Sequence, residues 1–166
     1  MSRWRPPPEK SSPYITPQGF AMLQEEEKSI WTKRAEVTAA LSAAAAEGDR
    51  SENAEYIYRK KQLREIDRRI RYLQKRLPEL IVVNKVSSED QVFFGASATL
   101  EREDGSEVTY RIVGADEIDT DSSKGYISAD SPMARALLKK QIDDEFDLKI
   151  GDHKETFIIT KIKYSV

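Results

Sequence analysis

The sequence predicts an α+β fold, in which an antiparallel coiled-coil helical hairpin precedes a small antiparallel β domain with one short helix. Two observations carry this prediction. Apolar residues in the first half recur at alternating spacings of three and four, as in helices that pack along a partner. After Pro78 they form short runs rich in β-branched and aromatic residues, which are typical of strands. We expect a disordered proline-rich tail at 1–12, the hairpin at 13–79 and the β domain at 80–166.

The first helix has a clear start and end in the sequence. Thr16 is a favoured N-cap, and Pro17 is tolerated at the first helical position because its missing N–H would have no partner there. Gly48 is a natural C′ residue. Two seam positions are charged, which costs stability but can fix the register. The seam consists of Phe20, Leu23, Glu27, Ile30, Arg34, Val37 and Leu41.

A second helix follows after a short connection, and Pro78 ends it because proline lacks a donor and restricts the residue before it. Two such helices must run antiparallel, so that each buries its apolar stripe on the other. At about 1.5 Å of rise per residue, the hairpin is roughly 40 Å long, with residues 47–55 at its tip. The second seam consists of Leu63, Ile66, Ile70, Leu73 and Leu77.

The second half of the chain predicts a strongly curved or half-closed antiparallel sheet with one helix packed on it. Asp104 and Gly105 are a strong hairpin signal. The helix is expected over Met133–Lys140, with Ser131 as its cap and Pro132 at its first position. The expected strands are 80–83, 91–94, 97–103, 107–113, 126–128, 146–150 and 156–164.

The composition excludes several classes of site. The chain has no cysteine, which rules out disulfides, thiolate zinc sites and cysteine nucleophiles. His153 is the single histidine, no Ser/His/Asp set is apparent, and the glycines form no phosphate-binding loop. No apolar run is long enough to span a membrane and the first residues form no secretory signal, so we expect a cytoplasmic protein. The net charge of −2 combines +4 in residues 1–79 with −6 in residues 80–166.

The predicted tip contains two carboxylates, Asp49 and Glu52, and the sequence leaves two interpretations open. Spacing alone favours a capping box, in which the aspartate caps the second helix and the glutamate reaches back. Ser51 is a competing cap, and both acids point outward if it takes that position. Because Mg²⁺ takes about six oxygen ligands, two carboxylates could only complete a site whose other ligands belong to another molecule.

The second helix is strongly basic, with nine Lys and Arg residues from 59 to 76 against two acids. A charge run is usually a solvated face, but such a face normally mixes signs, and this one favours a polyanionic partner. Few aromatic residues interleave on it, which favours phosphate contact over base stacking. Lys61, Arg64, Arg68, Arg71 and Lys75 fall on the face away from the first helix. The candidate RNA-contacting residues are Arg59, Lys60, Lys61, Arg64, Arg68 and Arg71.

Several segments resemble one known family. The segment 48–56, Gly-Asp-Arg-Ser-Glu-Asn-Ala-Glu-Tyr, resembles the coiled-coil tip of the bacterial Gre transcript cleavage factors. Phe94–Ala96, Tyr110–Gly114 and Asp130–Leu137 are similar to that family's C-terminal domain, in the same order. The resemblance covers residues 13–166, and the dense basic run together with Arg50 favours the GreB type.

The resemblance implies a factor that binds RNA polymerase through an FKBP-like C-terminal domain without isomerase activity. Asp130, Ser131 and Pro132 match the segment that contacts the rim of the secondary channel, although a simple helix cap also explains them. The hairpin would enter the channel, where Asp49 and Glu52 would share a Mg²⁺ ion with the polymerase. The basic helix would lie near the extruded 3′ end of the nascent RNA.

Such a factor is not itself an enzyme but stimulates the polymerase's own cleavage of backtracked RNA, and we expect it to be a monomer. Two alternatives stay open at this point. One is a secondary-channel regulator without cleavage activity, against which the retention of both tip acids argues. The other is a structural coiled-coil adaptor that binds RNA, in which the tip acids are only helix caps.

Overall fold

The computed structural model describes residues 10–48, 53–86, 88–118 and 124–164. The chain divides into two compact units. The helical unit is Phe20–Leu80, and the sheet unit combines Met1–Gly19 with Ile81–Val166. Residues 13–19, which the sequence analysis places with the hairpin, thus group with the sheet.

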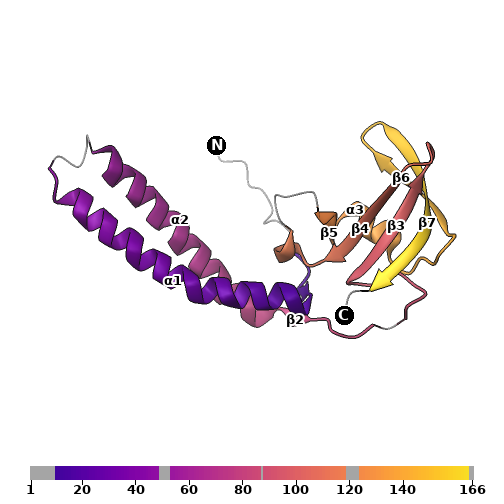
Figure 1. Cartoon of the computed structure of the whole chain (residues 1–166), viewed down its shortest axis with the longest axis horizontal. Coiled ribbons are helices and arrows are strands. Elements are labelled where there is room, and N and C mark those ends of the chain that lie inside the picture. Colours follow the sequence, from indigo (N-terminus) through magenta and orange to yellow (C-terminus); the bar gives the residue numbers. More distant parts are fainter. Residues whose placement is uncertain (1–9, 49–52, 87, 119–123, 165–166) are drawn as a thin grey trace, which may run out of the picture. The chain divides into compact units, whose positions relative to one another are not determined.

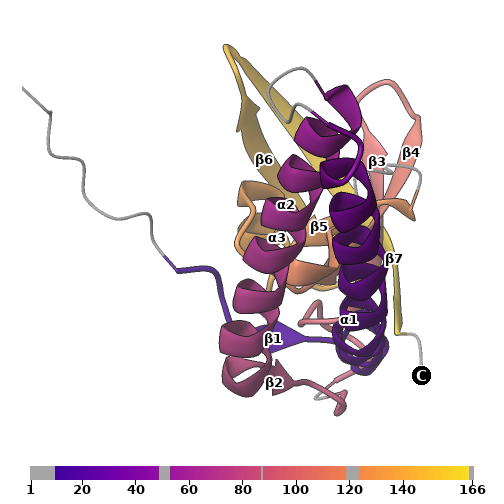
Figure 2. The same ribbon diagram turned by 90° about the vertical axis from the view of Figure 1, so that its left-hand side faces the viewer.

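The helical unit is a hairpin of two long antiparallel helices, as the heptad spacing predicts (Figures 1 and 2). α1 spans Pro17–Ala45 and α2 spans Ala54–Arg76, and a short 3-10 helix, η1 (Leu77–Glu79), follows directly. The predicted N-cap of α1 is confirmed, since the Gly19 N–H donates to Thr16 Oγ1 at 3.1 Å. α1 ends before the glycine expected to stop it, and Gly48 adopts a φ of 129° in the turn beyond.

The two predicted seams supply the buried contact between the helices. Ile30 and Val37 of α1 form one core cluster with Ile66 and Ile70 of α2, and Leu63 packs against it. Buried apolar residues of α1 recur every seventh position, at the seam residues Leu23, Ile30 and Val37 and then at Ala44, beyond the predicted seam. Those of α2 are Ile66, Ile70 and Leu73.

A cross-helix ion pair explains how the seam tolerates a charged residue. Arg34 Nε of α1 lies 2.7 Å from Asp67 Oδ1 of α2. The hydrogen bond to this carboxylate raises the pKa of Arg34. The pair also opposes slippage of one helix along the other, because a shift of one turn would separate the two groups. Polar seam residues can fix register in this way.

The sheet unit contains a five-stranded sheet with the strand order β5-β4-β3-β7-β6 (Figure 1). Its core includes Leu100, Ile112, Phe157 and Ile159, and Leu137 of the short helix α3 (Pro132–Leu137) packs into the same cluster. The strands are β3 (Ala96–Arg102), β4 (Glu107–Val113), β5 (Tyr126–Ser128), β6 (Glu145–Ile150) and β7 (His153–Tyr164). The predicted α+β class is therefore confirmed.

The sheet is mixed, whereas the sequence analysis predicts an antiparallel one. β5 pairs with β4 in parallel, with Arg111 opposite Tyr126. Parallel neighbours need a connection that crosses from one end of the strands to the other. The 3-10 helix η2 (Ala115–Glu117) lies in the connection between β4 and β5. The period-two pattern that identifies a strand does not report its direction, which explains the error.

Two expected elements differ in extent. The segment 91–94 forms no strand and contributes only an isolated antiparallel bridge from Gln91 to Gln141. The helix expected over Met133–Lys140 ends at Leu137, and Lys139 has a φ of 70°. This backbone value lies in the left-handed region, which cannot continue a right-handed helix.

The segment before α1 is integrated into the sheet unit. Its strand β1 (Tyr14–Ile15), which the sequence analysis does not predict, pairs in parallel with β2 (Ile81–Val82). The carboxylate of Glu117 then receives three donors: the Thr16 N–H at 3.1 Å, the Gly114 N–H at 2.6 Å, and the Thr16 hydroxyl. A Cβ at Gly19 would overlap this carboxylate. Glu117 therefore ties the start of α1 to η2.

We expect Glu117→Ala to lower the free energy of unfolding by about 2–3 kcal/mol, because it leaves the buried Thr16 hydroxyl and two backbone donors without an acceptor. Urea unfolding followed by circular dichroism measures this change. The exposed Glu103→Ala is the matched control, with an expected change below about 0.5 kcal/mol. Equal effects of both substitutions would contradict the role given to Glu117.

Candidate functional site

The base of the hairpin tip is closed by Asn53. Its Oδ1 accepts the Tyr56 N–H at 3.0 Å and so caps α2, while its Nδ2 donates to the Ala44 carbonyl of α1 at 2.7 Å. One amide therefore satisfies an orphan donor at the start of α2 and gives the Ala44 carbonyl of α1 a second donor beside the Glu47 N–H, which lies at 3.2 Å. The two helix ends are held together at the point where the tip connection begins.

Asp49 and Glu52, the two acids singled out in the sequence, lie outside the described residues, as does Ser51. The capping hypothesis for them can still be corrected, because the N-cap of α2 is Asn53 and not Asp49 or Ser51. Asn53 was not among the caps predicted from the sequence, although asparagine directly before a helical run is itself a strong cap signal. Within the described ranges, no three His, Asp or Glu residues gather into a possible metal site.

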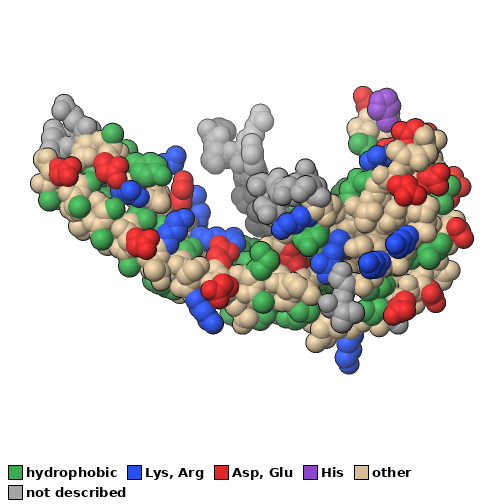
Figure 3. All heavy atoms as spheres, viewed as in Figure 1, with side chains coloured by type: hydrophobic (Ala, Val, Ile, Leu, Met, Phe, Trp, Pro, Cys, Tyr) green, Lys and Arg blue, Asp and Glu red, His purple; other side chains and the backbone are tan. Residues whose placement is uncertain are grey.

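The structure sorts the cations of α2 into two groups. Three are engaged: Arg59 with Glu55 at 2.8 Å, Arg69 with Glu26 at 2.7 Å, and Arg76, which is 8% exposed, at 3.9 Å from Glu79. The exposed members are Lys60, Lys61, Arg64, Arg68, Arg71 and Lys75. We call these six the basic stripe. Figure 3 shows Lys and Arg side chains gathered along the middle of the hairpin, with acidic residues beside them.

The basic stripe is left without compensating charge inside the hairpin. Among the described residues, none of its members forms an ion pair within 4.0 Å. Lys60 lies 5.9 Å from the centroid of the Tyr56 ring, a weak cation–π contact. Of the candidate RNA-contacting residues, Arg59 is the one already bonded within its own helix. The others remain available to an anionic partner.

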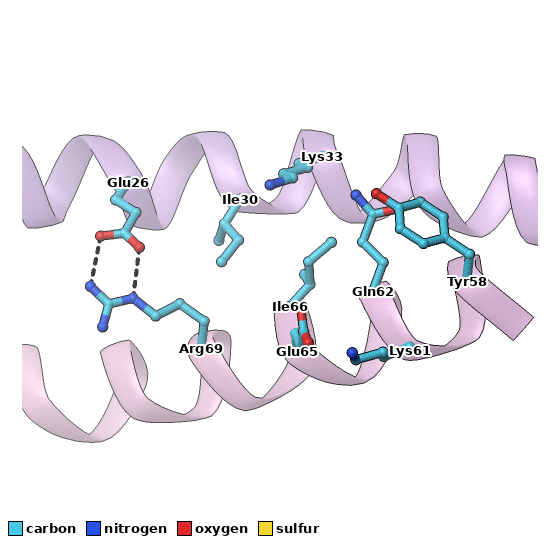
Figure 4. Close-up of a pocket in the computed structure, with 9 residues that line it drawn as sticks. All are labelled: Glu26, Ile30, Lys33, Tyr58, Lys61, Gln62, Glu65, Ile66 and Arg69. Carbon is cyan, nitrogen blue, oxygen red and sulfur yellow. Dashed lines mark hydrogen bonds and ion pairs between the residues drawn. The ribbon is translucent and has the colours of Figure 1, made fainter. Parts of the chain in front are cut away.

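The pair between Glu26 and Arg69 is bidentate and joins the two helices (Figure 4). Arg69 Nε donates to Glu26 Oε1 at 2.7 Å and Arg69 Nη2 donates to Oε2 at 2.9 Å. The hydrogen bonds from Arg69 lower the pKa of the Glu26 carboxyl. Bidentate pairs of this kind are among the stronger charge-assisted contacts. The sequence analysis missed this pair because Glu26 lies beside the seam and not on it.

The segment Asp130, Ser131 and Pro132 is rigidly held in the sheet unit. Ser131 caps α3, since its Oγ accepts the Ala134 N–H at 3.2 Å, and Pro132 is the first helical residue, as predicted. The Asp130 carboxylate accepts the Ser12 N–H at 2.9 Å and also the Ser12 hydroxyl. No sequence pattern predicts this contact, because it joins residues far apart in the chain.

Comparisons with known proteins decide the family. A family model described as "Transcription elongation factor, N-terminal" matches residues 13–82, and one described as "Transcription elongation factor, GreA/GreB, C-term" matches residues 87–164. The chain belongs to the GreA/GreB family of transcription elongation factors. No helix in the described part of this Gre-family chain is long and apolar enough to cross a membrane.

Relatives named GreB match this chain over nearly its full length. The transcription elongation factor GreB of Xanthomonas axonopodis pv. citri is 57% identical, covering 99% of this chain and 99% of the relative. GreB of Pseudomonas aeruginosa is 49% identical over 99% of this chain and 98% of the relative. A solved structure of the transcription factor Gfh1 is 21% identical, covers 90% of this chain and 96% of that one, and has a TM-score of 0.43.

We expect Asn53→Ala to destabilise the protein by about 1–2 kcal/mol, because both the cap of α2 and the hydrogen bond that Asn53 donates to the Ala44 carbonyl of α1 are lost. Asn53→Ser keeps a capping oxygen but not the donor to the Ala44 carbonyl, so it should recover only part of this loss. Thermal unfolding, followed by circular dichroism at a wavelength that reports helix content, measures the stability of both variants. Asn84→Ala, at an exposed asparagine, is the control, and the assignment fails if Asn53→Ser restores full stability.

We expect the stability contributed by Glu26 to depend on pH. Its pKa is lowered in the folded state, so the contribution is present above the unfolded-state pKa and is lost as pH falls through the folded-state pKa. The gap in unfolding free energy between wild type and Glu26→Gln should be at most about 1 kcal/mol at neutral pH, since the pair is partly exposed. Urea titrations from pH 7 downward should show this gap closing below about pH 4.5, and a constant gap would contradict the assignment.

Proposed function

We propose that this Gre-family chain stimulates the cleavage that RNA polymerase itself performs on backtracked RNA. It acts as a monomer in the cytoplasm, enters the secondary channel with its hairpin first and is not itself the enzyme. The observation that carries this proposal is the pair of carboxylates, Asp49 and Glu52, in the connection between two long antiparallel helices of a chain of this family. Membership of this family makes RNA polymerase the proposed partner. The length of the hairpin would carry the two tip carboxylates into the secondary channel.

The chemistry assigned to the tip is completion of a shared metal site. Cleavage of a phosphodiester by water needs a hydroxide-like nucleophile, which a bound Mg²⁺ ion supplies by lowering the pKa of its water. Two carboxylates give at most part of the oxygen shell that this ion needs. Asp49 and Glu52 would provide those oxygens and orient the attacking water, while the remaining ligands come from the polymerase.

The hydrogen bonds at the base of the tip support this role. Oxygen ligands act on a metal only when they are placed within a fraction of an ångström of the productive geometry. Asn53 joins the ends of α1 and α2 through two hydrogen bonds. Because it caps α2, neither acid is needed as the N-cap. The acids are thereby available for a ligand role.

The basic stripe and the sheet unit have separate tasks in this proposal. The stripe contacts the phosphates of the extruded 3′ end of the nascent RNA by charge alone, which does not depend on sequence. The sheet unit contacts the polymerase at the channel rim through Asp130, Ser131 and Pro132. The hydrogen bonds from Ser12 fix the orientation of the Asp130 carboxylate before it meets the polymerase.

The direct test uses stalled, backtracked elongation complexes incubated with the protein and Mg²⁺, with transcript shortening as the readout. We expect Asp49→Asn or Glu52→Gln to reduce the rate by at least about 100-fold while polymerase binding is retained, because each removes one charged oxygen ligand. Glu47→Gln removes an exposed acid on the same connection and is the matched control. Wild-type rates in the Asp49 and Glu52 variants would refute the proposal.

A further inference from the structure

A groove on the flank of the hairpin combines features that suit a nucleotide. It is about 390 Å³ in volume and is lined by residues of both helices. The buried seam residues Ile30 and Ile66 lie at its floor, and the ion pair of Glu26 with Arg69 lies toward one end (Figure 4). Lys33 projects from α1, while Tyr58 and Gln62 lie toward the other end. We propose that this groove binds one unstacked nucleotide of single-stranded RNA, an inference that rests on the proposed function for the identity of the RNA.

Tyr58 is the stacking surface of the proposed site. It is 58% exposed, although it lies on a helix where burying an aromatic side chain would add stability. The Arg59 guanidinium lies 5.5 Å from the centroid of its ring, which leaves the other face of the ring for a base. Single-stranded nucleic acids are bound by such combinations of exposed aromatic residues and cations, and stacking tolerates any base. The sequence analysis argued against base stacking because it considered only the outward face of α2, whereas Tyr58 lies on its flank.

Two lysines from different helices provide the phosphate contact. Lys33 of α1 and Lys61 of α2 both line the groove and are exposed. Neither forms an ion pair with another described residue. The carboxylate of Glu26, which would otherwise repel a phosphate, is already neutralised by its two hydrogen bonds to Arg69. Because Glu26 and Arg69 neutralise each other, Lys33 and Lys61 outnumber the one remaining carboxylate of the lining, Glu65, and the groove presents a net positive charge beside an aromatic ring.

The remaining polar residues suit the edge of a base. Gln62 Oε1 accepts a hydrogen bond from Arg59 Nη1 at 3.0 Å, which leaves the amide N–H groups of Gln62 to donate. Glu65 lines the same groove and can accept from an exocyclic amino group. Both kinds of contact are available to the edges of an unpaired base. A protein partner is less favoured, because the lining is mostly charged and polar.

The site also continues the basic stripe. Lys61 belongs both to the stripe and to the groove. RNA that follows the stripe by phosphate contacts would therefore reach Tyr58 without leaving the helix. One base would be held there, which limits how far the strand slides along the hairpin.

The test measures binding of the full chain to a fluorescein-labelled single-stranded RNA by fluorescence anisotropy at low salt. We expect Tyr58→Leu to weaken binding about 5- to 20-fold and Tyr58→Phe to change it less than about twofold, since the ring and not the hydroxyl carries the stacking. Lys33→Gln should lower the slope of log affinity against log salt by about 0.7, the value for one contact to a single-stranded phosphate. Tyr58→Leu should leave that slope unchanged.

Matched controls lie on α1. Trp31 is 49% exposed and does not line the groove, so Trp31→Leu tests for the loss of any surface aromatic residue. Lys28→Gln tests for the loss of a lysine that lies outside the groove. We expect both to bind RNA as wild type does. The inference is overturned if wild type does not bind the RNA or if Tyr58→Leu binds it within twofold of wild type. It is also overturned if Trp31→Leu loses as much RNA affinity as Tyr58→Leu.

Two further measurements separate this inference from the proposed function. Transcript shortening by the wild-type protein tests the proposed function without reference to Tyr58. If shortening is absent but Tyr58→Leu still loses RNA affinity, the proposed function fails and the groove remains an RNA site. If Tyr58→Leu weakens binding to polymerase without affecting binding to free RNA, the occupant of the groove is a protein and the inference is wrong.

Discussion

The narrow seam between α1 and α2 is the constraint on which the helical unit depends. Each helix of this unit offers a single apolar stripe, and among the described residues the buried cluster consists of Ile30, Val37, Ile66 and Ile70, with Leu63 against it. Isolated helices gain little stability from propensity alone, so packing of this stripe must supply it. A seam this thin also makes the register sensitive to every polar contact. The ion pairs of Arg34 with Asp67 and of Glu26 with Arg69 join the two helices and fix that register.

The same contacts determine which charges remain available to a partner. Asp67, Glu26 and Glu55 are each bonded to an arginine, so these acids do not offset the exposed cations of α2. A helix that looks uniformly basic in sequence is thus divided into structural arginines and a free basic stripe. Different members of this run of basic residues therefore stabilise the hairpin and attract an anionic partner. This division explains how a hairpin with few buried residues can carry a strongly positive face.

The sequence predicted much of this organisation because its signals are local. Heptad spacing identified both helices, Thr16 and Ser131 were recognised as caps, and the strands that flank Asp104 and Gly105 followed from turn chemistry. The contacts that the sequence did not predict are of a different kind. The contacts of Asn53 with Ala44, of Glu117 with Thr16 and of Ser12 with Asp130 all join segments separated in the chain. Neither periodicity nor propensity reports such contacts, and the same holds for the direction of β5.

The chain by itself determined the kinds of elements, their order and the residue types at the tip, since a helix cap, a heptad stripe or a turn is encoded within a few neighbouring positions. Only the tertiary structure decided which arginines form ion pairs, which amide joins the two helix ends at the tip, and that Tyr58 and Lys33 line one groove. These outcomes depend on two helices or two distant segments coming within hydrogen-bond distance. That approach is set by packing of the whole unit and not by any one stretch of sequence.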